Sequence, residues 1–153
     1  MTPNLFLVKP DDVENLWFGA RPLIQKALNH AEGALTTTDA LRLVLNGRMQ
    51  LWVGFDNDEI FVAILTEIIT YPRHKVCRVI TTATKTGHDF DEWWDTMYHA
   101  VEQFALSRGC AAFEAWVRKG LARKLKWDNE YSVIYKTLKY NPEVLNELRW
   151  RRC

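Results

Sequence analysis

In the first third of the chain, the spacing of apolar residues changes from that of a strand to that of a helix. Apolar residues at 5, 7 and 8 predict a short first strand. From Leu16 to Leu28 the apolar positions are spaced by three and four, which predicts an amphipathic helix that Pro22 kinks or splits. Thr38 is a suitable cap for a second helix, and Gly47 is a suitable end. The pattern therefore predicts a strand followed by two helices.

The middle of the chain has the pattern of an antiparallel meander. Leu51 to Phe55 predicts a strand, and Asp56-Asn57-Asp58 after it has the residues of a hairpin turn. Ile60 to Tyr71 is long, apolar and β-branched, as expected of a central strand. After a turn at Pro72-Arg73-His74, Val76 to Thr82 predicts the third strand of the meander.

The last third returns to alternating helices and strands. Asp91 to Ser107 predicts the longest helix, and Ala111 to Val117 predicts a strand after it, so the helix would be a right-handed crossover between parallel strands. A short basic helix at Lys119 to Lys126, a strand at Tyr131 to Leu138 and a helix at Val144 to Trp150 complete the pattern.

Composition narrows the class of protein. With 153 residues, one domain is expected, here residues 1–140 with a C-terminal helical tail at 141–153. A net charge of +1 gives no global field that would select nucleic acid or an anionic membrane. Cys77, Cys110 and Cys153 are an odd number without CxxC spacing, which favours reduced thiols and a cytoplasmic location. No apolar run predicts a signal peptide or a membrane span.

The order of elements resembles the Gcn5-related N-acetyltransferase (GNAT) family over about residues 5–138. The segment Lys119 to Leu125, with its glycine, arginine and leucine, is similar to the late helix of that family, and Ser132 to Lys136 is similar to the strand that follows it. The resemblance implies an α/β fold with a mixed sheet, an antiparallel meander, a long crossover helix and C-terminal strands.

The resemblance also implies a place for acetyl-CoA, in a loop of the form Arg/Gln-x-x-Gly-x-Gly/Ala that leads into the long helix. The residues at that place here are Thr82, Thr84, Lys85, Thr86 and Gly87, which include a single glycine. Glycines let the backbone approach a pyrophosphate, which helix-terminal N–H groups bind. The stretch is followed by four acids that suit the helix dipole but repel phosphate, at positions Asp89, Asp91, Glu92 and Asp95. We therefore expect no cofactor, or acetyl-CoA if the protein is an enzyme.

Catalytic residues follow only from the resemblance. Family enzymes often use a glutamate on a central strand as base and a late tyrosine as acid, and Glu67 and Tyr135 are the candidates here. A carboxylate inside an apolar strand lies either at a wet edge or in a cleft, and the sequence leaves both open. No nucleophile elbow or spaced metal-ligand set is visible, and the polar run from His88 to Glu92 is interpreted as a capped helix start.

Basic and aromatic residues near the C-terminus suggest a binding surface. A cluster from Arg118 to Lys126 lacks acids, and tryptophans lie close to it in sequence. Such interleaving occurs in single-stranded nucleic-acid sites, whereas the alternatives are a solvated helix face or a contact with an acidic protein. The residues predicted to contact a partner are Trp93, Arg123, Lys124, Trp127 and Trp150.

These observations lead to three hypotheses. The first is a degenerate GNAT-like protein, similar to small phage proteins, that acts through protein contacts in virion assembly, ejection or host takeover without acetyl-CoA turnover. The second is an active N-acetyltransferase with an atypical loop. The third is a nucleic-acid-binding module that uses the basic cluster, whose binding would depend steeply on salt.

Overall fold

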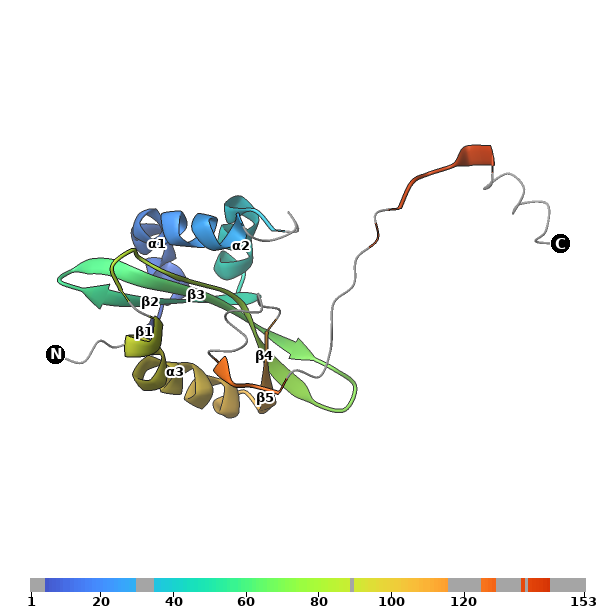
Figure 1. The fold of residues 1–153 in the computed structure, drawn as a ribbon. Helices are drawn as coiled ribbons and strands as arrows, with labels where there is room; N and C mark the ends of the chain where they lie inside the picture. Colours follow the sequence, from blue (N-terminus) through green and yellow to red (C-terminus); the bar gives the residue numbers. More distant parts are fainter. Residues whose placement is uncertain are drawn as a thin grey trace.

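The computed structural model describes residues 5–29, 35–88, 90–115, 125–128, 136 and 138–143. A five-stranded sheet in the order β1-β2-β3-β4-β5 lies between two helical layers, with α1 and α2 on one face and α3 on the other (Figure 1). The elements are β1 (Leu5–Leu7), a 3-10 turn (Pro10–Asp12), α1 (Val13–Leu28), α2 (Thr37–Leu45), β2 (Met49–Asp56), β3 (Glu59–Thr70), β4 (Lys75–Thr84), α3 (Phe90–Ser107) and β5 (Cys110–Ala115). The predicted α/β class and the meander are confirmed.

The first helix differs from its prediction. Helix α1 continues without a break past Pro22, although proline removes one backbone hydrogen bond. Its buried stripe, which includes Ala20, Leu23, Ile24 and Leu28, packs on the sheet on both sides of that proline. Apolar packing therefore outweighs the local cost of the proline: Pro22 does not split the helix, and the alternative of a kink stays a prediction.

The second helix begins two residues before the position predicted from sequence. Thr36, not Thr38, is the cap: its Oγ1 accepts a hydrogen bond from the Asp39 amide at 3.1 Å. In return the Asp39 carboxylate accepts from the Thr36 amide at 3.1 Å, and this hydrogen bond to the backbone is the first cause that lowers the pKa of Asp39. This reciprocal pair is a capping box, which fixes the start of α2.

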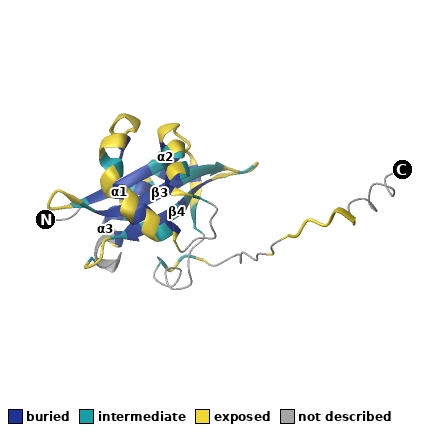
Figure 2. Ribbon diagram, turned by 90° about the horizontal axis from the view of Figure 1, so that it is seen from above, coloured by how far each residue is buried: buried dark blue, intermediate teal, exposed yellow. Residues whose placement is uncertain are grey.

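Strands β2, β3 and β4 pair antiparallel, and β5 joins β4 in parallel after the crossover helix α3. The β2–β3 hairpin turns at Asn57 and Asp58, which both have positive φ, as its tight right-handed geometry requires. The buried residues form one cluster on each face of the sheet, and Figure 2 shows the buried strands between exposed helix surfaces.

Close packing of α3 depends on a missing side chain in β2. A Cβ on Gly54 would lie 2.6 Å from both Met97 Cε and Val62 Cγ1, so no larger residue fits there without a shift. On the same face Trp52 Nε1 donates to Thr66 Oγ1 at 3.0 Å, and that hydroxyl donates to Gln50 Oε1 at 2.9 Å. The Trp52 indole N–H and the Thr66 hydroxyl therefore both have hydrogen-bond partners.

Candidate functional site: the outer edge of strand β4

The two halves of β4 have different neighbours. From Lys75 to Val79 the strand pairs in parallel with β5, and the last pair within the described part of the chain is Val79 with Ala115. Beyond this point β4 continues to Thr84 while still pairing with β3. The second half of the strand, from Ile80 to Thr84, therefore has β3 on one side and no described strand on the other.

A β-bulge separates these halves. Thr66 of β3 lies opposite Val79, and Leu65 lies opposite Thr81, so Ile80 is an extra residue in β4. A bulge bends its strand and shifts the side-chain alternation by one position. Before the bulge Cys77 and Val79 face α3, whereas after it Thr82 and Thr84 lie opposite Ile64 and Val62 on that face.

The backbone direction of the second half follows from one hydrogen bond. The Lys85 amide donates to the Phe61 carbonyl at 2.7 Å, so this residue faces β3. Hydrogen-bonded residues alternate along an antiparallel ladder, which directs Ala83 toward β3 as well. The amides of Thr82 and Thr84 therefore face away from β3, along the outer edge of β4.

A partly buried ion pair joins β4 to β5 just before the bulge. Arg78 Nε donates to Glu114 Oε1 at 2.7 Å, and Tyr71 Oη donates to Glu114 Oε2 at 2.9 Å. The Arg78 and Glu114 side chains are 20% and 27% exposed. Burial alone would lower the pKa of Arg78, but the hydrogen bonds that Arg78 donates to Glu114 and Tyr71 outweigh it and raise that pKa. We call Tyr71, Arg78 and Glu114 the clasp.

The turn after β4 leads directly into α3. The His88 amide donates to the Lys85 carbonyl at 3.2 Å, and Gly87 has a φ of 95°, a conformation that glycine adopts without strain. A Cβ on Gly87 would meet nothing within 4 Å, so the turn is open. The predicted residues Lys85, Thr86 and Gly87 thus lie together between the edge of β4 and the start of α3.

Acidic side chains surround this turn. Lys85 Nζ binds Glu59 Oε2 at 2.7 Å, and this hydrogen bond is the first cause that lowers the pKa of Glu59. His88 Nε2 lies 3.4 Å from Asp56 Oδ2, and its ring lies against that of Phe61. The cation predicted to offset phosphate charge is therefore already paired. Asp89 and the side chains of Asp91 and Glu92 lie outside the described residues.

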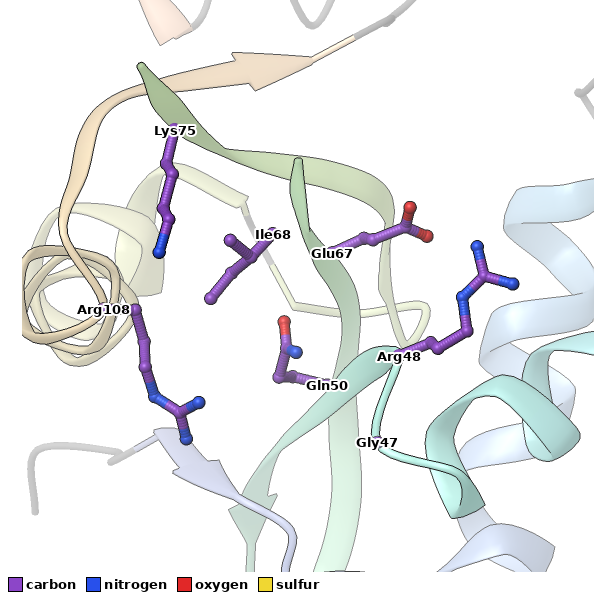
Figure 3. A pocket seen from close by; sticks show the side chains of 7 residues that line it. All are labelled: Gly47, Arg48, Gln50, Glu67, Ile68, Lys75 and Arg108. Carbon is purple, nitrogen blue, oxygen red and sulfur yellow. The ribbon is translucent and has the colours of Figure 1, made fainter. Parts of the chain in front are cut away.

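The structure places Glu67 away from this turn. Glu67 lies opposite Arg78 and lines a hollow of about 340 Å³ (Figure 3). The other residues that line the hollow are Gly47, Arg48, Gln50, Ile68, Lys75 and Arg108. Along β4, Thr82 lies four positions after Arg78, which is roughly 13 Å. As a base for chemistry at Thr82, Glu67 remains a prediction.

The predicted partner surface is only partly visible. Tyr135, Arg123, Lys124 and Trp150 lie outside the described residues, as does the side chain of Trp93. The sequence also predicted the basic helix, the strand from Tyr131 and the terminal helix, which fall mainly outside the described range.

Trp127 is described, and its ring packs against the body of the protein. It stacks on Phe113 with centroids 5.4 Å apart and lies 6.3 Å from Trp94. The ring is half-buried, which leaves part of it for a partner but gives it a packing role as well.

Sequence reasoning missed the clasp and the bulge. Glu114 interrupts an otherwise apolar strand in the same manner as Glu67, and this was the one available signal. The tyrosine and arginine partners lie 43 and 36 positions away, so their meeting depends on the sheet register. Within the described ranges no group of three His, Cys, Asp or Glu residues could hold a metal ion, and no helix could span a membrane.

Known structures share the fold of this chain. No protein-family model and no curated protein sequence matches the chain. An aminoglycoside acetyltransferase from an uncultured soil metagenomic sample, in complex with sisomicin, matches with a TM-score of 0.69 at 12% identity, over 90% of this chain and 97% of that one. A GNAT family acetyltransferase from Staphylococcus aureus matches with a TM-score of 0.63 at 13% identity, over 90% and 100%. An aminoglycoside N-acetyltransferase in complex with CoA matches with a TM-score of 0.67 at 10% identity, over 90% and 95%.

These identities are too low to transfer an activity, but the likeness in shape is extensive. The chain has a GNAT-like fold, as the sequence analysis expected. The three similar structures named above are those of acetyltransferases. Nothing in the comparisons supports a phage origin or a role in a virion, so those remain predictions.

Proposed function

We propose that the protein is an acyl-CoA-dependent N-acyltransferase with acetyl-CoA as the donor. One observation supports this most directly: beyond the bulge at Ile80, β4 extends its outer backbone edge toward an open glycine turn and the start of a long helix. Such an edge offers amide groups in a row to an extended molecule, as in strand addition. The turn then offers a place for negative charge.

The residues present fit part of an acyl-CoA molecule well. The outward backbone groups of Thr82 and Thr84 would bind the amide-containing pantetheine arm. The open turn at Thr86 and Gly87 would lie against the pyrophosphate. The fit is poorer at the turn, where Lys85 is paired with Glu59 and Asp56 adds a second acid nearby. We therefore expect binding to be weak and sensitive to salt.

The reaction balances without a further reagent. The acceptor nitrogen forms a bond to the acyl carbon, the carbon–sulfur bond breaks, the nitrogen loses a proton and the departing thiolate gains one. The β4 edge contributes amide N–H groups that stabilise the negative charge on the carbonyl oxygen as the tetrahedral intermediate forms. Glu67 and Tyr135 remain predictions for proton transfer, and Glu67 and Glu114 lie opposite the same residue of β4, Arg78.

Two proline variants test the use of this edge. Thr82→Pro removes an amide that faces away from β3, so the fold should persist while acetyl-CoA affinity falls at least about tenfold. Ala83→Pro is the matched control, because it removes an amide that faces β3 and should lower the unfolding midpoint instead. Calorimetric titration with acetyl-CoA and CoA, together with thermal unfolding, measures both effects.

Two results would overturn the proposal. One is wild-type protein that binds neither acetyl-CoA nor CoA at millimolar concentration. The other is a folded Thr82→Pro variant with wild-type affinity, because the edge could not then be the binding surface.

A second candidate function is supported by the acidic surroundings of the turn. If the Lys85–Glu59 pair and Asp56 exclude pyrophosphate, the fold would act through protein contacts without turnover. Wild-type protein that fails the titration but binds a protein partner would support this candidate.

A further inference from the structure

The hollow at the end of the sheet where β4 begins carries more positive than negative charge. Three of the residues that line it are cations, Arg48, Lys75 and Arg108, and one is a carboxylate, Glu67, so its net charge is +2. Within the described part of the chain, none of the three cations forms an ion pair. Unpaired cations gathered around a hollow favour an anionic ligand.

The alternation of side chains along β3 divides these charges between the two faces of the sheet. Glu67 lies opposite Met49, which belongs to the core under α1, so its carboxylate is on the α1 and α2 face. The next residue, Ile68, packs against the cluster under α3. Figure 3 shows Glu67 and Arg48 on one side of β3 and the other long side chains of the hollow on the opposite side. The α3 side therefore keeps two cations, and the residues lining it include no acid.

These two cations come from the start of β4 and the end of α3. Lys75 lies opposite Cys110, which belongs to the cluster under α3. Burial is the main cause that raises the pKa of Cys110, and the nearby Lys75 ammonium partly opposes it. The Arg108 guanidinium lies over the ring of Phe104, 5.0 Å from its centroid. Stacking uses the flat face of a guanidinium, so the N–H groups at its edge stay available to a ligand.

Gln50 adds an uncharged donor on the same side. Its Oε1 accepts a hydrogen bond from Thr66 Oγ1 at 2.9 Å, and the same hydroxyl accepts from Trp52, whose ring packs under α3. This contact fixes the Gln50 amide on the α3 face. Among the described residues, Gln50 Nε2 has no hydrogen-bond partner. The α3 side of the hollow thus offers side-chain donors from β2, from β4 and from the end of α3.

The C-terminal end of a helix has a partial negative charge that would repel an anion. At the end of α3 the carbonyls of Phe104, Ala105 and Leu106 already accept hydrogen bonds from the residues that follow them. Arg108 also adds a full positive charge immediately after this end. The charged side chains therefore outweigh the helix dipole in the hollow.

We propose that the α3 side of this hollow binds a dianionic phosphate group, as free phosphate or as a phosphate monoester. Two cations match its two negative charges, and its several oxygens can accept hydrogen bonds from an ammonium, a guanidinium and an amide that come from different directions. Lys75 lies seven positions before Thr82 along β4, which is roughly 23 Å. The phosphate site is therefore separate from the acyl-CoA edge and does not depend on the proposed acyltransferase function.

NMR titration of the intact protein tests this inference directly. Methyl phosphate and inorganic phosphate, added at constant ionic strength and about pH 8, where the monoester is a dianion, should shift the side-chain NH2 signals of Gln50. Dimethyl phosphate, a monoanion like the diesters of nucleic acid, should bind at least about tenfold more weakly. Absence of a shift at millimolar methyl phosphate overturns the inference. Equal affinity for the two esters overturns the dianion site and indicates a phosphodiester ligand instead.

Four variants separate a built site from a general attraction of anions, with the backbone amide signal of residue 75 as the readout. Lys75→Gln should raise the Kd for methyl phosphate at least about tenfold, because it removes a charge-assisted hydrogen bond. Gln50→Glu keeps an acceptor for Thr66 but places a carboxylate in the hollow, so binding should be lost.

The other two variants are controls. Arg48→Gln removes a cation on the opposite face of the sheet, and Arg21→Gln removes an exposed cation of α1. Both should change the Kd less than about threefold, as expected for screened charges. A rise in Kd for Arg48→Gln equal to that for Lys75→Gln overturns the assignment to the α3 side. Thermal unfolding checks that all four variants are folded.

Discussion

The two halves of β4 differ in how their edges are used. From Lys75 to Val79 the strand has neighbours on both sides, and the clasp fastens it to β5. From Ile80 to Thr84 it has β3 on one side, and its other edge faces away. The bulge residue Ile80 lies between the two halves of β4. The first half therefore supplies stability, and the second half supplies the surface on which we place chemistry.

This division explains why the polar groups are distributed as they are. In the first half the Arg78 and Glu114 charges are mostly buried and satisfy each other. In the second half the threonines offer hydroxyls and backbone groups without charge, and one hydroxyl remains unpartnered. Charges that hold strands together would obstruct a ligand edge, so the bulge keeps the two uses apart.

Breaking the clasp should have the largest effect. Glu114→Ala leaves the mostly buried Arg78 guanidinium without its carboxylate, and we expect a loss of about 2–3 kcal/mol in the free energy of unfolding, since the pair keeps some exposure. Urea denaturation measures it. A double variant, Arg78→Leu with Glu114→Leu, should lose less than the two single variants together. A loss below about 0.5 kcal/mol for Glu114→Ala would mean that the clasp does not stabilise the first half.

Releasing Lys85, which follows the second half of β4, from its ion pair should have a smaller effect. Glu59→Gln releases Lys85, so CoA affinity should improve about threefold to fivefold at low salt, as expected for an exposed pair. Lys85→Gln is the control and should weaken CoA binding. Calorimetry at two salt concentrations checks both, and the gain should shrink at the higher one. Unchanged affinity in both variants would show that Lys85 does not face the phosphates.

The reactivity of the Cys77 thiol should show that the first half of β4 is buried, without any substitution. Burial is the main cause that raises the pKa of Cys77 to about 11, so at pH 8 about one thiol in a thousand is ionised. Iodoacetamide should label Cys77 slowly in native protein and rapidly in denaturant, as peptide mapping by mass spectrometry would show. Rapid native labelling would mean that the paired half opens readily.

The raised pKa of Cys77 also makes the free energy of unfolding depend on pH. The unfolded thiol ionises with its ordinary pKa of 9.0, whereas the folded thiol keeps its proton to a higher pH. Above pH 9 the unfolded state therefore binds fewer protons than the folded state, and the free energy of unfolding falls as pH rises toward 11. Cys77→Ala should lack this part of the decline.

The sequence predicts the meander because short stretches of the chain are enough to identify its strands and turns. Asn57 and Asp58 tolerate positive φ, and the long apolar run after them can only be a buried strand. The edges of helices were less predictable, as Thr36 and Thr38 are chemically alike and only the position of Asp39 closes the capping box. The prediction at Pro22 used only the local preference of proline to interrupt helices. It could not take into account the packing of α1 on the core.

The candidate site was only partly predictable. Its location after Thr82 followed from a family resemblance, but the bulge at Ile80 has no signature, since an extra residue in a run of β-branched residues looks like any other. Glu67 was proposed as the base only because the family resemblance implies a glutamate on a central strand. Glu114 forms the ion pair with Arg78, and that pairing depends on the register of the assembled sheet.

The strand order of the sheet, which equals the order along the chain, has a consequence for folding kinetics. The β2–β3 and β3–β4 hairpins close loops of a few residues, whereas β1 and β5 must each join after a helical excursion. Short loop closures are fast, and longer ones slow the search. The meander should therefore be the folding nucleus, so variants on β3 should change the folding rate. Variants of the β5 contact should change mainly the unfolding rate.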